Sequence, residues 1–252
     1  MTCSGSASEA GPRPVPIALV AAEVAIVAVD LANEQLRTPE LLATLDDVEQ
    51  SVAARFVRPG DRCRYEAAHV GLRVVLAACE RTGMAAVTIV RTACRRCGAP
   101  HGKPVLLDRP DVGFSLARAG TLALVAVAAG PVGVDLEPVD GRPPPNLVRS
   151  ICTPGEVGAL EAAGAPSANV LRMWTRKEAL LKATGEGLTR DPRTVEVGRG
   201  GATTVDGFRV TDVDVGVAGY VAAASWAGSA PRRLRLGAVV VDGGQPSWVI
   251  DG

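Results

Sequence analysis

The spacing of apolar residues along the first half predicts one long helix and several strands. Ala68, Leu72, Val75, Leu76 and Cys79 recur at helical intervals and form a stripe that faces a core. This helix is predicted to begin with Asp61 as its N-cap and to run to about Arg81, where Gly83 closes it. A shorter helix is predicted before it, at 41–57. Strands are predicted at 23–31, 86–92, 121–128 and 132–137, because these runs are short and mostly apolar or β-branched.

The second half repeats this plan. Thr153-Pro154-Gly155-Glu156 is typical of a helix start, with proline in the first turn followed by an acid. A long helix is predicted from Asn169 to Thr184, followed by strands at 194–197, 208–213, 219–225 and 234–241. Strands joined by short turns favour antiparallel sheets. The predicted fold class is therefore α+β, with a long helix on a small antiparallel sheet in each of two similar halves.

Four segments make up the predicted domain organisation. Residues 1–16 are rich in Ser, Gly, Pro and Ala and are predicted to be a flexible N-terminal tail. The first lobe spans 17–138 and the second spans 147–252. Between them, 139–146 contains Gly141 and the three prolines Pro143 to Pro145, which is typical of a linker.

Composition excludes several classes of protein. The 252 residues are 47% hydrophobic, which is enough for a core, and Lys plus Arg equals Asp plus Glu at 27 each. This balance argues against nucleic-acid binding over the whole surface. No apolar run approaches the length of a membrane span, and Ile17 to Val29 is interrupted by Glu23, which favours a buried strand over a signal peptide. The six scattered cysteines indicate a reducing, cytoplasmic setting.

The helix that contains Trp174, Glu178 and Lys182 is the main candidate for chemistry. These residues are four apart and share one helix face, so a carboxylate and an ammonium group lie one turn from each other. Gly185 and Gly187 follow at the helix end. Taken alone, the pair also fits an ordinary surface ion pair, and the choice depends on the rest of the chain.

Asp135 and Glu137 supply two further carboxylates. They are two apart at the end of an apolar strand, so both side chains point to the same side of the sheet. Two carboxylates from a strand and a third from a helix are hard oxygen ligands that suit Mg²⁺. A solvated strand end is the alternative interpretation.

Cations that suit a phosphate occur in the first half. Lys103 lies between Gly102 and Pro104, at the tip of a fixed turn. An arginine cluster surrounds the start of the long helix (Arg55, Arg58, Arg62, Arg64). Taken in isolation, Lys103 fits an exposed loop lysine better, and a solvated surface is the alternative interpretation of the arginines.

Cys94, Cys97 and His101 have the spacing of zinc ligands, but only three ligands are present locally, whereas structural zinc sites have four. A redox role would need the cysteine pair at a helix start, which the pattern does not predict. The chain also lacks the glycine-rich phosphate loops of nucleotide-binding enzymes.

Together these residues resemble the 4′-phosphopantetheinyl transferases, in particular the larger type that activates peptide and polyketide synthases. The main motifs are Gly133-Val134-Asp135-Leu136-Glu137 and, some forty residues later, Trp174-x-x-Lys177-Glu178-Ala179-x-x-Lys182. Supporting motifs extend the resemblance over about 55–187 (Arg55-Phe56, Asp61-x-x-Arg64, Gly102-Lys103-Pro104, Phe114-Ser115-Leu116, Thr153-Pro154-x-Glu156).

The resemblance implies a monomer of two similar lobes with the active site between them. It implies that phosphopantetheine passes from coenzyme A to a serine of an apo acyl or peptidyl carrier protein, releasing adenosine 3′,5′-bisphosphate. It assigns Mg²⁺ to Asp135, Glu137 and Glu178, and catalysis to Glu178 and Lys182. It leaves open whether Glu178 or a hydroxide on the metal is the base. It also assigns coenzyme A contacts to a larger set of residues (Arg55, Arg64, Lys103, Pro104, Arg118, Asp135, Lys177, Lys182).

The chain departs from the family pattern at Ala117-Arg118, where the family has a Ser-His pair. Arg118 keeps a cation at the position of the histidine. This departure motivates a second hypothesis, a homologue that binds coenzyme A with little or no turnover. A third hypothesis is an interaction module stabilised by zinc at Cys94, Cys97 and His101.

Overall fold

The structure is a computed structural model that describes residues 23–140, 143–144, 146–164, 167–230 and 232–250. The predicted tail at 1–16 lies outside these residues, and so does part of the predicted linker at 139–146. None of the helices that the described residues form combines the length and apolarity that crossing a membrane requires.

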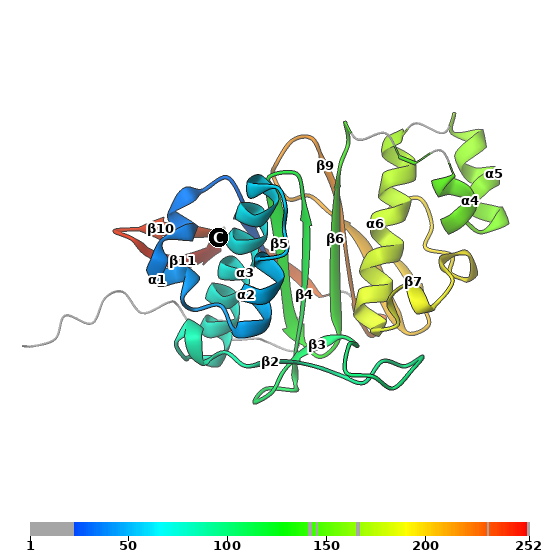
Figure 1. The fold of residues 1–252 in the computed structure, drawn as a ribbon. Coiled ribbons are helices and arrows are strands. Elements are labelled where there is room, and N and C mark those ends of the chain that lie inside the picture. The colour runs from blue at the N-terminus through cyan, green and yellow to red at the C-terminus, as the bar shows by residue number, and fades with distance from the viewer. Residues whose placement is uncertain (1–22, 141–142, 145, 165–166, 231, 251–252) are drawn as a thin grey trace, which may run out of the picture.

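Two sheets and two long helices form the core (Figure 1). The first sheet has the strand order β11-β10-β1-β5-β4, in which only the β1–β10 pair is parallel. The second sheet is antiparallel, with the order β6-β9-β8-β7. A short hairpin of β2 and β3 lies apart from both sheets. The strands span Glu23–Asp30 (β1), Ile89–Arg91 (β2), Pro104–Leu106 (β3), Val112–Ala119 (β4), Leu122–Ala129 (β5), Val132–Pro138 (β6), Thr203–Val205 (β7), Phe208–Val213 (β8), Tyr220–Ala227 (β9), Arg233–Asp242 (β10) and Gln245–Ile250 (β11).

The helices lie outside the sheets, with α3 and α6 on opposite sides of the strands in Figure 1. They span Pro39–Leu42 (α1), Asp47–Ala53 (α2), Pro59–Glu80 (α3), Leu147–Ile151 (α4), Pro154–Ala162 (α5) and Ser167–Thr184 (α6), with 3₁₀ turns at Glu34–Arg37, Met84–Ala86, Gly187–Thr189 and Pro192–Thr194. The α+β class predicted from the sequence is confirmed.

Alternating residues of the strands fill separate core layers. Val125 and Val127 of β5 pack with α3, whereas Leu124 and Ala126 pack against β6 and β9 of the second sheet. A third cluster lies between α6, the short helices before it and β8. The order helix, sheet, sheet, helix follows from the alternation of side chains in a strand.

The long helix α3 differs at its ends from the prediction. It begins at Pro59, with Arg58 as N-cap, and Asp61 lies in its first turn. Proline suits the first helical position, since it has no N–H to leave unpaired. The helix ends at Glu80, within one residue of the predicted Arg81, and its C-cap is Arg81, with a positive φ of 57°, in place of Gly83. The predicted apolar stripe, Ala68 to Cys79, is buried as expected.

The boundaries predicted for the two lobes do not follow the sheets. The strand β6 was predicted to belong to the first lobe but pairs with β9 in the second sheet. The strands β10 and β11, predicted for the second lobe, extend the first sheet beside β1. The chain therefore crosses between the sheets twice.

Candidate functional site

Alternate residues of β6 face the helix α6. At Gly133 the strand lies so near the helix that a Cβ would be 2.0 Å from Ala179 O. Farther along β6, Asp135 contacts Lys182 and Glu137 contacts Trp174. The sequence pattern of a glycine and two acids at intervals of two thus places both carboxylates against one helix face.

Asp135 forms the centre of this contact. Its Oδ1 accepts a hydrogen bond from Lys182 Nζ at 2.6 Å, and the same ammonium donates to Val134 O at 3.2 Å. The Asp135 residue is only 7% exposed. Its second oxygen, Oδ2, is buried and has no hydrogen-bond partner among the described residues. A buried carboxylate oxygen without a partner is costly, so this position favours a cation or a donor.

Glu137 and Glu178 add negative charge beside Asp135. Glu137 Oε1 accepts a hydrogen bond from Trp174 Nε1 at 3.2 Å. Burial and the neighbouring Asp135 charge raise the pKa of Glu137. Burial likewise raises the pKa of Glu178; Asp135 and Glu137 act in the same direction, while Lys182 opposes them. The carboxylates of Asp135, Glu137 and Glu178 therefore repel one another, and a bound cation would reduce this repulsion.

These residues fit a magnesium ion by chemistry. The donors are carboxylate oxygens, which Mg²⁺ prefers, and Asp135 offers an unused one. The carboxylate oxygens do not all converge: among the described residues, only Cys94, Cys97 and His101 bring three ligand atoms within 4.8 Å of one another. Magnesium commonly completes its shell with water and substrate phosphates, so a wider carboxylate set remains compatible with it.

A cavity of about 770 Å³ lies next to this cluster and is lined by both halves of the chain. Lys182 lines it from α6, and Lys103 and Pro104 line it from the β2–β3 hairpin. Lys103 Nζ donates to Val132 O at 2.9 Å and to Ala183 O at 3.0 Å, so it joins the hairpin to β6 and α6. Burial lowers the pKa of Lys103 to about 8. Two amines thus face one cavity of a size that accommodates a small molecule.

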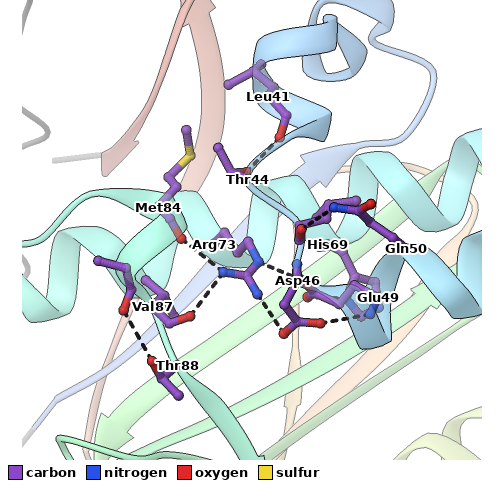
Figure 2. A network of polar contacts seen from close by, with 12 residues as sticks. Leu41, Thr44, Asp46, Glu49, Gln50, His69, Arg73, Met84, Val87 and Thr88 are labelled. Atoms are coloured by element: carbon purple, nitrogen blue, oxygen red, sulfur yellow. Dashed lines mark hydrogen bonds and ion pairs between the residues drawn. The ribbon is translucent and has the colours of Figure 1, made fainter.

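A buried polar network supports the wall of the cavity in the first half (Figure 2). Arg73 is 1% exposed and bonds to Glu49 Oε2 at 2.6 Å, Asp46 Oδ2 at 2.8 Å and the carbonyls of Met84 and Val87. Glu49 Oε1 lies 2.8 Å from His69 Nδ1. Because Arg73 joins α3 to the segments on either side of it, the network fixes this wall.

The predicted arginine contacts lie around a second, smaller pocket of about 280 Å³. Arg64 and Arg118 both line it. The Arg118 guanidinium lies 5.6 Å from the Phe56 ring centre and 5.3 Å from that of Tyr65, within the range of cation–π attraction. Arg55 is exposed next to Phe56. Tyr65 lines the large cavity, whereas Arg118, which lies over its ring, lines the smaller pocket.

Lys177 does not contact either pocket, contrary to the prediction that it binds coenzyme A. Its side chain is fully buried, and its ammonium lies 2.7 Å from Glu156 Oε2 and donates to the carbonyls of Pro192 and Val195. Position 177 lies about 100° from Glu178 and about 140° from Lys182 around the helix axis, so its cation enters the core of the second half. Lys177 and Glu156 therefore form a buried ion pair that stabilises the fold.

Three supporting residues went unassigned in the sequence. Ser115 Oγ accepts a hydrogen bond from Val134 N at 3.1 Å and so joins β4 to β6 beside Asp135. The Trp174 indole orients Glu137. Glu156 closes the capping box of α5 and also pairs with Lys177, which explains why Thr153-Pro154-x-Glu156 accompanies the lysine motif. The motif Thr153-Pro154-x-Glu156, which has no assigned ligand, was the sequence signal that pointed to this structural role.

Comparison with known proteins places this arrangement in a family. Residues 131–223 match the model of the 4′-phosphopantetheinyl transferase superfamily, a range that contains all three carboxylates and Lys182. The chain is 30% identical over 188 residues to the 4′-phosphopantetheinyl transferase HetI of Nostoc sp., covering 71% of this chain and 76% of HetI. The chain belongs to the 4′-phosphopantetheinyl transferase superfamily.

Two other members of the superfamily match shorter ranges. A putative 4′-phosphopantetheinyl transferase of Synechocystis sp. is 31% identical, over 60% of this chain and 61% of its own length. The L-aminoadipate-semialdehyde dehydrogenase-phosphopantetheinyl transferase of Eremothecium gossypii is 29% identical, over 61% of this chain and 60% of its own length. The chain thus spans under two thirds of these two relatives.

Proposed function

We propose that this chain transfers the 4′-phosphopantetheine arm of coenzyme A to a serine of an apo acyl or peptidyl carrier protein and releases adenosine 3′,5′-bisphosphate. The observation that carries the proposal is the meeting of Asp135 and Lys182 between β6 and α6, with a buried carboxylate oxygen left unpartnered. Membership of the superfamily supports the same reaction. We expect a monomer that acts in the cytoplasm.

Charge placement explains how these residues would serve phosphoryl transfer. Asp135, Glu137 and Glu178 would hold Mg²⁺, which supplies neutralisation of charge on the phosphate oxygens when bound. Lys182 and Lys103 line the cavity and would contact the phosphates of coenzyme A, while Arg64 and Arg55 would hold its nucleotide end. Transition states of this kind need alignment and electrostatic stabilisation more than covalent participation.

Glu178 is the proposed base for the attacking serine. Burial and the neighbouring carboxylates raise its pKa in the metal-free chain. With Mg²⁺ bound, a hydroxide on the metal is the alternative base. In the balanced step, the serine oxygen forms a bond to the phosphorus of the pantetheine phosphate. The bond from that phosphorus to the bridging oxygen breaks, and the serine proton passes to Glu178.

The test is transfer to an apo-carrier protein, measured as a gain in carrier mass equal to the phosphopantetheine group. The full chain with coenzyme A and Mg²⁺ should produce this gain. Asp135→Asn or Glu178→Gln should reduce the rate by about 100-fold or more, since each removes a carboxylate that would hold Mg²⁺ and so weakens the neutralisation of charge on the phosphate oxygens. Asp140→Asn is the matched control, because Asp140 is exposed just past the end of β6.

Two results would contradict the proposal. One is no mass gain with several different apo-carriers; the other is near-full activity in either site variant. The second hypothesis, binding of coenzyme A without turnover, is motivated by Arg118, which lies over Phe56 and Tyr65 where the family has a histidine. Calorimetry that finds coenzyme A binding in a chain with no transfer would favour this second hypothesis.

A further inference from the structure

The loop between β2 and β3 gathers three soft metal ligands. One ligand atom each from Cys94, Cys97 and His101 lie within 4.8 Å of one another, and Cys97 Sγ is 3.0 Å from His101 Nε2. Asp135, Glu137 and Glu178, the carboxylates beside Lys182, do not bring their ligand atoms this close together. Thiolates and imidazole prefer Zn²⁺ to Mg²⁺, so the cluster is chemically distinct from the carboxylate site.

The backbone of this loop is folded around the Cys94 sulfur. Gly98 N donates to Cys94 O at 2.8 Å, and Cys94 N donates to Ala99 O at 2.8 Å. Gly98 has a φ of 73°, a left-handed conformation that suits glycine and permits this reversal. The backbone N–H groups of Arg96 and Cys97 hydrogen-bond to the Cys94 sulfur, so the loop wraps around this atom.

We propose that this loop binds one Zn²⁺ ion through Cys94 Sγ, Cys97 Sγ and His101 Nε2. The fourth position of the tetrahedron is left to water, because Cys97 and His101 are exposed and open to solvent. Cys94 and Cys97 are both free thiols, so both sulfurs are available to the ion.

The ion would stiffen a wall of the large cavity. The loop closes where Thr92 N donates to Lys103 O at 3.1 Å and Gly102 N donates to Thr92 O at 2.9 Å. A Cβ on Gly102 would lie 2.6 to 2.8 Å from atoms of Thr92 and Ala93, so the two ends of the loop already touch. Only Gly102 separates His101 from Lys103, which lines the cavity. A metal ion bound to His101 would therefore restrict the position of Lys103.

Metal content of the full chain, prepared without a histidine tag, tests the site directly. We expect one zinc per chain, and cobalt substitution should give the visible absorption of tetrahedral Co²⁺ with thiolate charge-transfer bands. Changes in the surroundings of a ligand alone lower metal affinity by about 10- to 100-fold, so Cys97→Ser or His101→Ala should lower zinc affinity by more than about 100-fold. Both residues are exposed, so neither variant endangers folding. Cys63→Ser, on α3, is the matched control and should keep one zinc.

Three outcomes would overturn the site. The reduced chain takes up no Zn²⁺ or Co²⁺; Cys97→Ser retains full zinc affinity; or the chain purified under reducing conditions contains a Cys94–Cys97 disulfide and no metal. Each readout is independent of transfer, so the zinc site and the proposed function fail separately.

The link to the cavity rests on the proposed function and has its own readout. Removal of zinc with Mg²⁺ kept in excess should raise the KM for coenzyme A, with a smaller change in kcat, because the loop shapes binding and lies away from the carboxylates. An unchanged KM in the zinc-free chain would show that the ion does not stiffen this wall.

Discussion

The close approach of β6 and α6 at Gly133 gives the sharpest prediction. A methyl group at Gly133 would lie 2.0 Å from Ala179 O and 2.6 Å from Ala183 N. Both atoms belong to the helix backbone, so no side chain can be moved or shortened to make room. Gly133→Ala must therefore push the strand and the helix apart.

The size of the effect follows from the distances. Cβ contacts under 3.0 Å are essentially never found, so the two elements must separate by at least 3.0 minus 2.0, or 1.0 Å. Overpacking of a core typically costs about 1–3 kcal/mol, and a rigid backbone clash belongs at the upper end. A shift of this size also separates Asp135 from Lys182, and misplacement of catalytic groups by about 1 Å lowers rates about 100-fold. We expect Gly133→Ala to lose about 3 kcal/mol of unfolding free energy and about 100-fold in transfer rate.

Urea unfolding and the carrier-mass assay measure the two effects. The control is Gly158→Ala in α5, where nothing lies within 4 Å of the added methyl group. Alanine is favoured over glycine within a helix, so this variant should gain about 0.5–1 kcal/mol and keep its activity. A Gly133→Ala chain as stable and as active as the unmodified protein would refute the reasoning. So would equal destabilisation by both variants, which would point to a general effect of removing glycine.

Three further predictions concern the surrounding structure. Lys177→Met should lower the unfolding free energy by about 3–5 kcal/mol, since it leaves Glu156 charged and buried, while kcat per folded molecule stays unchanged; a loss of kcat without a loss of stability would contradict this. Burial would raise the pKa of Glu49, but hydrogen bonds from His69 and from the Asp46 backbone, with the charges of His69 and Arg73, lower it below 4.5. Its stabilisation is therefore full above pH 4.5 and is lost as pH falls through the lowered pKa, so urea titrations of Glu49→Gln should show a weaker acid dependence; an unchanged dependence would exclude the group. Trp174→Phe removes the hydrogen bond to Glu137 and should raise the Mg²⁺ concentration for half-maximal transfer about 10- to 100-fold, with unfolding free energy as the control; an unchanged Mg²⁺ requirement would contradict the assigned role.

Local patterns in the sequence predict the elements near the site better than their pairing. The strand β8 spans 208–213 as predicted, and β6 and α6 differ from prediction by one or two residues. The parallel pairing of β1 with β10 joins segments about 210 residues apart. Each strand has the same alternating pattern whichever partner it meets, so the pattern carries no information on which sheet it joins.

The predicted strand at 194–197 shows how side chains replace a sheet. Val195 and Val197 are buried, as a strand prediction requires, but the segment pairs with no strand among the described elements. Val195 O accepts a hydrogen bond from Lys177, and Val197 O accepts two from Arg176. The carbonyl groups that would bond to a neighbouring strand are thus satisfied by two buried cations of α6. Apolar periodicity cannot reveal this, because the donors lie about 18 to 21 residues earlier in the chain.

The same donors explain why Lys177 and Lys182 could not be distinguished in the sequence. Both lysines lie in one motif of α6, and five helical steps of 100° place them about 140° apart. The face that carries Lys177 meets the carbonyls of Pro192 and Val195, while the face that carries Lys182 meets Asp135. The adjacent residues Lys177 and Glu178 therefore have different roles. Lys177 anchors α6 to Glu156 within the second half, whereas Glu178 lies beside Asp135 and Glu137. The second half is thus held together by a buried ion pair that contacts no ligand. Loss of this pair should first appear as loss of stability.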